Sequence, residues 1–150
     1  MTCVAVALLG VALTVFKVVV IASVRDEELE ENYTQALVVA LRKMDPDKNV
    51  IVCHVNHAQN FVNATHAHYE LPLFGFNRTQ GYDIYVFDSG FFSRQGDGGF
   101  NNWCFAGNFK RGEGRFESNV TFSPIHSPWS STFPFLRLHS YTETLFLSRE

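Results

Sequence analysis

The stretch from Asp45 to Val55, DPDKNVIVCHV, marks the change from a helical to a strand pattern in this sequence. The Asp-Pro-Asp triplet at its start is typical of a segment that ends a helix. From Asn49 onward the period becomes two residues, so that Ile51, Cys53 and Val55 would share one face of a strand. The sequence therefore predicts helix before this stretch and sheet after it.

The segment 25–44 predicts an amphipathic helix. Apolar side chains recur at steps of three and four residues from Leu29 to Met44. Acidic residues gather in its first two turns, and Arg42 and Lys43 lie in its last turn, as the helix dipole favours.

Alternating patterns predict strands in the second part of the chain. These segments are Asn49–Val55, His66–Phe74, Tyr82–Phe87 and Phe100–Phe109. No helical pattern fits between them, which favours antiparallel pairing. The expected fold class is α+β, with an N-terminal helix or helices packed on an antiparallel meander of four to six strands.

Three regions differ in composition. Residues 1–24 are almost continuously apolar and fit a signal peptide, a buried helix or a membrane anchor, although Lys17 interrupts the run. Residues 25–115 form the predicted α+β domain. Residues 116–150 are predicted to be an irregular, charge-poor extension, with a short strand-like segment at Tyr141–Leu147.

Charge and cysteine content limit the partners. The 150-residue chain has a formal net charge of −3, and no run of Lys or Arg exceeds two residues, which argues against a nucleic-acid partner. The N-terminal segment leaves membrane contact open. Three widely spaced cysteines form no disulfide framework; Cys53 and Cys104 are either bridged or buried as thiols.

Four Asn-x-Thr sequons indicate passage through the secretory pathway. They are possible glycosylation sites at Asn32, Asn63, Asn77 and Asn119. Together with the apolar N-terminus, they predict a secreted or membrane-associated protein.

The segment His66-Ala-His68-Tyr-Glu70 is the candidate for chemistry. On a strand, His66, His68 and Glu70 point the same way and could hold a divalent metal, with His54 or His57 as a further ligand. The alternatives are a solvated strand face and a histidine contact that responds to pH. No other cofactor is predicted.

Catalysis by a nucleophile is not favoured. Cys53 and His54 are adjacent in sequence, so a strand would place them on opposite faces. Gly96, Asp97, Gly98 and Gly99 lead into a strand pattern rather than a helix. They therefore predict a hairpin turn instead of a phosphate-binding loop.

The block Gly96-Asp-Gly-Gly-Phe-Asn-Asn-Trp103, after Gly81-Tyr-Asp-Ile-Tyr85, resembles a signature of small, mostly fungal proteins of unknown function. The resemblance covers roughly Glu27 to Arg111. It implies a small, often secreted protein built of helix and sheet, with no established catalytic residues.

The sequence as a whole favours a small, secreted, non-enzymatic protein that acts by binding. Such a role would need exposed aromatic side chains, for example Phe91, Phe92 or Phe100. The alternatives are a metal-binding protein or metal-dependent enzyme that uses the His66, His68 and Glu70 strand, and a membrane-anchored or membrane-active protein.

Overall fold

The computed structural model describes residues 3–23, 25–74, 77–95, 103–113 and 118–125, and within them the chain forms two helices and eight strands. The helices are α1 (Cys3–Ala22) and α2 (Asp26–Met44). The strands are β1 (Asn49–Cys53), β2 (His57–Val62), β3 (Thr65–Pro72), β4 (Thr79–Phe87), β5 (Ser89–Arg94), β6 (Trp103–Ala106), β7 (Phe109–Arg111) and β8 (Asn119–Phe122).

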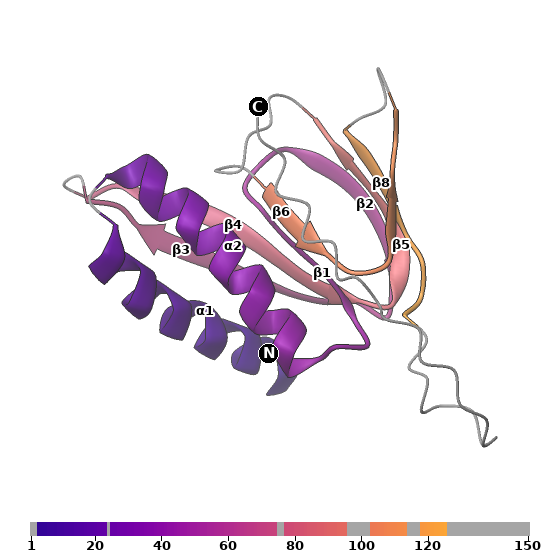
Figure 1. Cartoon of the computed structure of the whole chain (residues 1–150), viewed down its shortest axis with the longest axis horizontal. Coiled ribbons are helices and arrows are strands. Elements are labelled where there is room, and N and C mark those ends of the chain that lie inside the picture. Colours follow the sequence, from indigo (N-terminus) through magenta and orange to yellow (C-terminus); the bar gives the residue numbers. More distant parts are fainter. Residues whose placement is uncertain (1–2, 24, 75–76, 96–102, 114–117, 126–150) are drawn as a thin grey trace, which may run out of the picture.

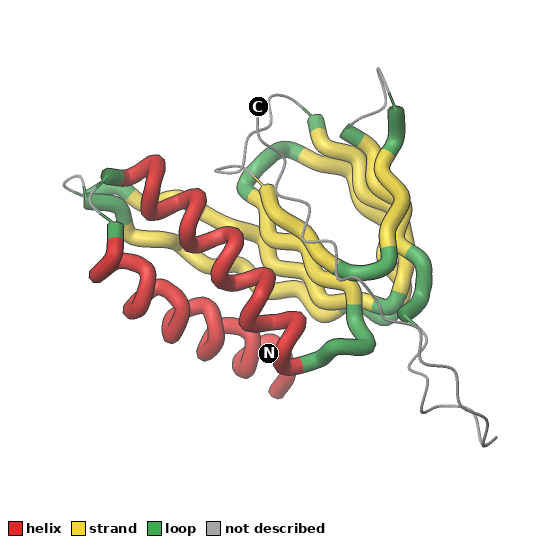
Figure 2. The backbone as a smooth tube through the Cα atoms, viewed as in Figure 1, coloured by secondary structure: helices red, strands yellow, loops and turns green. Residues whose placement is uncertain are grey.

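The strands form two four-stranded antiparallel sheets. Sheet A has the order β3-β4-β1-β6, and sheet B has the order β2-β5-β8-β7. The helices cover one face of sheet A, and sheet B packs against part of its other face (Figure 1 and Figure 2). The predicted α+β class is therefore confirmed. The strand order differs from a meander, because the chain alternates between the two sheets.

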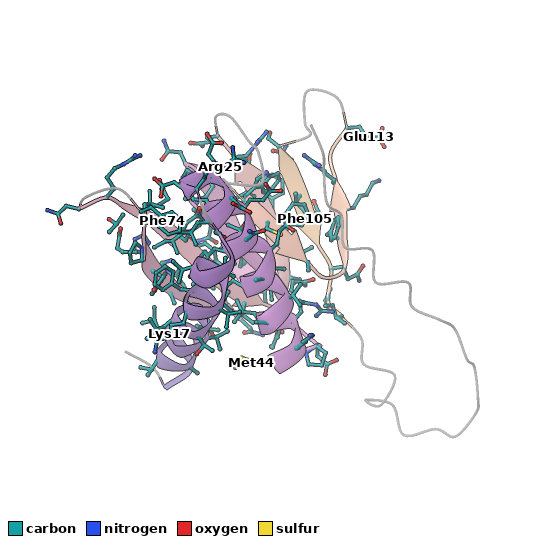
Figure 3. All side chains as sticks on the ribbon, turned by 60° about the vertical axis from the view of Figure 1, so that its left-hand side comes forward. Lys17, Arg25, Met44, Phe74, Phe105 and Glu113 are labelled. Atoms are coloured by element: carbon teal, nitrogen blue, oxygen red, sulfur yellow. The ribbon has the colours of Figure 1, made fainter. Side chains whose placement is uncertain are left out.

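Helix α2 matches the predicted helix within one residue. Its inward side chains include Leu29, Tyr33, Leu37 and Leu41, all of them buried. Side chains fill the space between the helices and sheet A (Figure 3). Burial of this apolar face is the main stabilising contribution to the helix, since an isolated helix of this length is marginal in water.

Strand β1 is buried along its whole length. Val50 and Val52 belong to the core beneath the helices, whereas Ile51 and Cys53 belong to the core between the two sheets. A strand whose two faces are both covered has apolar residues at consecutive positions. This accounts for the unbroken run that the sequence shows here.

The apolar N-terminal segment forms α1, which contacts α2 and β3. Leu8, Ala12 and Val19 are buried in the core beneath the helices, while Val6, Leu13 and Val18 are exposed.

Among the described residues, no helix combines the length and the apolar character that crossing a membrane requires.

The predicted strand Phe100–Phe109 is wrong as a single element. The chain turns at Gly107, whose φ of 141° suits glycine, so β6 lies in sheet A and β7 in sheet B. The three rings of Trp103, Phe105 and Phe109 still gather in one core, because the turn folds β7 back over β6.

The hairpin predicted around Gly96–Gly99 is also wrong in its pairing. These four residues lie outside the described ranges, but the strands on either side do not pair: β5 is in sheet B and β6 in sheet A. The segment therefore connects two sheets.

The chain continues in sheet B beyond the domain boundary predicted at residue 115. Strand β8 (Asn119–Phe122) lies between β5 and β7 in sheet B, with Val120 and Phe122 buried. Residues 126–150, including the predicted strand at Tyr141–Leu147, lie outside the described ranges.

Candidate functional site

The hairpin of β3 and β4 brings four ionisable side chains together. Its register places His68 opposite Asp83, and His66 opposite Tyr85. Residues opposite each other on antiparallel strands share a face. His66, His68, Glu70 and Asp83 therefore lie on the face of sheet A that is turned away from the helices. We call these four residues the polar face.

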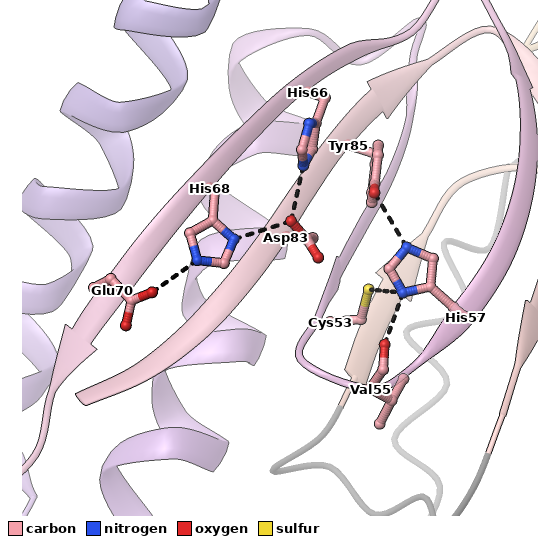
Figure 4. A network of polar contacts seen from close by, with 8 residues as sticks. All are labelled: Cys53, Val55, His57, His66, His68, Glu70, Asp83 and Tyr85. Carbon is pink, nitrogen blue, oxygen red and sulfur yellow. Dashed lines mark hydrogen bonds and ion pairs between the residues drawn. The ribbon is translucent and has the colours of Figure 1, made fainter. Parts of the chain in front are cut away.

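The polar face is a continuous chain of hydrogen bonds (Figure 4). His66 Nε2 and His68 Nδ1 both donate to Asp83 Oδ1, over 2.8 Å and 3.0 Å. His68 Nε2 donates to Glu70 Oε1 over 2.9 Å. Since carboxylates only accept, the His68 ring makes both of its contacts as hydrogen bonds when it carries a proton on each nitrogen, that is, as an imidazolium.

Sheet B leaves the polar face open to solvent. The side chains of His66, His68 and Glu70 are 50%, 49% and 56% exposed. No residue of β3 belongs to the core between the sheets. In Figure 1, β3 and the neighbouring end of β4 extend away from sheet B.

The hydrogen bonds shift the ionisation of the polar face in a consistent direction. The bond to Asp83, followed by the bond to Glu70, raises the pKa of His68. The bond from His68, with help from Thr79, lowers the pKa of Glu70. Burial alone would raise the pKa of Asp83, but the bonds from His68 and His66 outweigh it and lower that pKa.

A second network lies beside the first, at the border with sheet B. His57 Nδ1 donates to the carbonyl of Val55 over 2.7 Å, and its Nε2 lies 3.1 Å from the hydroxyl of Tyr85. Cys53 Sγ is 3.8 Å from His57 Nδ1. The networks meet at Tyr85, whose ring stacks on His66 with centroids 4.5 Å apart.

The contact between Cys53 and His57 is not that of an activated thiolate. Burial, with a smaller contribution from Asp83, raises the pKa of the Cys53 thiol. Burial also raises the pKa of Cys104 to about 11. Both cysteines are free thiols and face different cores, so the alternative of a bridge between them is wrong.

We expect both buried thiols to be slow to label. In a Cys3→Ser background, native protein should react with a maleimide at least about a hundredfold more slowly than denatured protein, because the thiolate is the reactive species. Mass spectrometry of timed samples measures the rate. Fast native labelling of Cys53 would contradict this expectation and indicate an activated thiolate.

The structure separates the predicted metal ligands. His66, His68 and Glu70 share one face as predicted, but His54 does not join them. Its ring contacts Tyr82, which lies in the core beneath the helices, on the opposite face of sheet A. Within the described part of the chain, no three His, Cys, Asp or Glu side chains are arranged to hold a metal ion. Three of the four imidazole nitrogens of His66 and His68 contact carboxylates instead.

The predicted aromatic contacts are placed differently. Phe91 is 39% exposed on the outer face of sheet B, whereas Phe92 is buried in the core between the sheets. Phe100 lies outside the described ranges.

The four sequons lie in different surroundings. Asn63 and Asn77 are exposed in turns, with φ of 52° and 53°, and Asn32 is exposed on α2. Asn119 is half-buried in β8, where its Oδ1 accepts a hydrogen bond from Ser93. Glycosylation stays a prediction at all four.

Asp83 and Tyr85 are the residues of the site that sequence reasoning missed. An aspartate within the otherwise apolar strand Tyr82–Phe87 is the signal that could have found them, because a half-buried carboxylate needs hydrogen-bond donors. The strand that precedes it in the chain carries two histidines with the same two-residue period.

No family model, curated protein or solved structure matches this chain. The resemblance to small fungal proteins therefore stays a prediction, as do secretion and the membrane alternative.

Proposed function

We propose that the protein is a non-enzymatic binding protein whose polar face holds a positively charged group of its ligand. The observation that carries this proposal is the exposed, hydrogen-bonded row of His66, Asp83, His68 and Glu70 on the part of sheet A that sheet B leaves open. Side chains already ordered by their neighbours lose less entropy when a ligand binds.

The net negative charge of the polar face favours a cationic ligand. Glu70 and Asp83 contribute two carboxylates, and the His68 imidazolium offsets only one of them. Glu70 is the more exposed acid and presents its solvent side to a ligand while His68 and Thr79 hold it. A guanidinium or ammonium group, such as an Arg or Lys side chain of a partner peptide, fits a pair of carboxylates best.

The neighbouring groups favour binding over catalysis. Burial raises the pKa of the Cys53 thiol, and burial, with Asp83 and Cys53, raises the pKa of Tyr85 to about 12. Both therefore keep their protons at neutral pH and are poor nucleophiles or bases there.

A hexa-arginine peptide tests the proposal, since guanidinium groups keep their charge at every accessible pH. We expect saturable binding by calorimetry at about pH 8, and Glu70→Gln should weaken it about tenfold by removing one charge-assisted hydrogen bond. Glu27→Gln is the matched control, because Glu27 is an exposed acid in the acidic first turn of α2. It should leave the affinity unchanged.

Two other probes decide between ligand classes. Tighter binding of inorganic phosphate than of hexa-arginine would contradict a cationic ligand. Stoichiometric zinc binding that is lost in a His66→Ala and His68→Ala double variant would favour the metal alternative. Equal losses in Glu70→Gln and Glu27→Gln would show that the peptide binds by general charge attraction.

A further inference from the structure

The sheet contains a slot for the imidazole ring of His68. Gly81 lies opposite Glu70 on β4, and a Cβ atom there would come within 2.8 Å of His68 Nε2 and 3.0 Å of Glu70 Oε1. Only a residue without a side chain lets the ring lie flat between Asp83 and Glu70. The glycine on β4 therefore leaves the space in which one imidazolium can contact both carboxylates.

We propose that His68 is a proton-operated gate of the polar face. With both ring protons in place, His68 acts as an internal cation that occupies the carboxylates of Asp83 and Glu70. When it loses one proton, a carboxylate is released and becomes available to a cation from outside. The identity of that cation as a ligand rests on the proposed function; the gate itself does not.

The geometry determines which carboxylate is released. A neutral imidazole has a single N–H, so one of its two contacts becomes a lone pair facing a carboxylate. Asp83 is held from two sides, by His66 and His68, and is 29% exposed. Glu70 is also held by two side chains, His68 and Thr79, but it lies at the rim of the sheet and is 56% exposed. Glu70 is therefore the acid that turns to solvent.

The groups around His68 come from four strands. Besides Asp83, Tyr85 lies on the same face of β4, and His66 and Glu70 lie beside His68 on β3. Cys53 of β1 is the cross-strand neighbour of Asp83, and His57 of β2 contacts Tyr85. The raised pKa values keep Tyr85 and Cys53 neutral through the physiological range. Charge changes on this face near neutral pH therefore do not come from Tyr85 or Cys53.

The direction of the gate follows from linkage. Because the folded pKa of His68 is raised, the stability that its contacts contribute is present below about pH 6.5 and is lost as pH rises through the folded pKa. The pKa values of Asp83 and Glu70 are lowered, so their pH dependence runs the other way. The stability that these carboxylates contribute is lost only as pH falls through their folded pKa values. The gate is closed in mild acid and opens above about pH 6.5.

Two-dimensional NMR of the histidine rings tests the gate without any ligand. We expect His68 to titrate above about pH 6.5, and Glu70→Gln and Gly81→Ala should each move that titration downward. Gly10→Ala is the control for a glycine substitution, since nothing lies within 4 Å of the Cβ it would add. An unshifted His68 titration, or one that Glu70→Gln leaves in place, would overturn the gate.

Hexa-arginine binding gives an independent readout. In the wild type, affinity should rise about tenfold between about pH 6 and pH 8, as the internal cation is lost. In His68→Gln, which lacks this ring, the rise in affinity over the same range should be clearly smaller than in the wild type. Equal pH dependence in both proteins would overturn the gate. Failure to bind at any pH, with the NMR shifts as expected, would overturn only the proposed function.

Discussion

Replacing Asn49 with alanine is expected to lower the free energy of unfolding by about 3 kcal/mol, because three backbone groups lose the hydrogen-bond partner that this side chain provides. Asn49 is fully buried. Its Nδ2 donates to the carbonyls of Asp88 (2.6 Å) and Ser123 (3.0 Å), and its Oδ1 accepts from the backbone N–H of Asn108 (2.8 Å). Alanine would leave all three backbone groups unpaired.

The position of these three partners explains why the effect should be large. Asp88 is the single residue between β4 in sheet A and β5 in sheet B, and Asn108 lies in the turn from β6 to β7. Ser123 follows β8 directly. The Asn49 side chain therefore bonds to three segments at which the chain enters or leaves sheet B, before β5, before β7 and after β8. Its loss weakens the junction of the two sheets as well as three hydrogen bonds.

Urea unfolding followed by circular dichroism measures the change. Asn60→Ala is the matched control, since Asn60 is exposed on β2, and it should stay within about 0.5 kcal/mol of wild type. Asn49→Asp keeps the shape but loses both donated bonds, so it should also be destabilised. Equal stability of Asn49→Ala and Asn60→Ala would contradict the role assigned to the junction.

Sequence reasoning succeeded where the signal is local. Helix α2 and the strands β1, β3 and β4 follow periodic runs bounded by turn residues, so a window of about ten residues contains the information. The shared face of His66, His68 and Glu70 was predicted for the same reason, since alternation along one strand fixes it.

The missed strands carry short or weak patterns. Strand β2 has one large apolar side chain in the core between the sheets, Phe61, and polar Gln59 and Asn60 precede it; β5 begins with Ser89 and Gly90. Strand β8 lies in a charge-free segment without a clear period. These strands form because they pair and pack with strands that are distant in the sequence. Their own residues carry no signal of those partners.

The division into two sheets and the role of Asp83 depend on distant partners. The turn at Gly107 decides that Phe109 joins sheet B, and the junction at Asn49 joins residues up to 74 positions apart. Asp83 meets His66 and His68 only through the register of the β3–β4 hairpin. A one-residue slip would move it to the opposite face.

Replacing Gly90 with alanine is expected to lower the free energy of unfolding by about 3 kcal/mol or more, through backbone strain and a direct clash. Gly90 has a φ of 141°, which residues with a side chain rarely adopt. An added Cβ would lie 2.2 Å from the carbonyl oxygen of Asn60 and 2.8 Å from Cα of Phe61. Both atoms are backbone atoms of the paired strand β2, so neither can move without breaking the ladder.

The same chain offers a glycine with the opposite expectation. Gly10 lies exposed within α1, and a Cβ atom added there would meet no neighbour within 4 Å, so Gly10→Ala should raise stability by about 0.5–1 kcal/mol. Urea unfolding of the two variants side by side separates the causes. If Gly90→Ala were as stable as Gly10→Ala, β2 and β5 would not pair as described, and the corner that turns the chain from sheet A into sheet B would have to lie elsewhere.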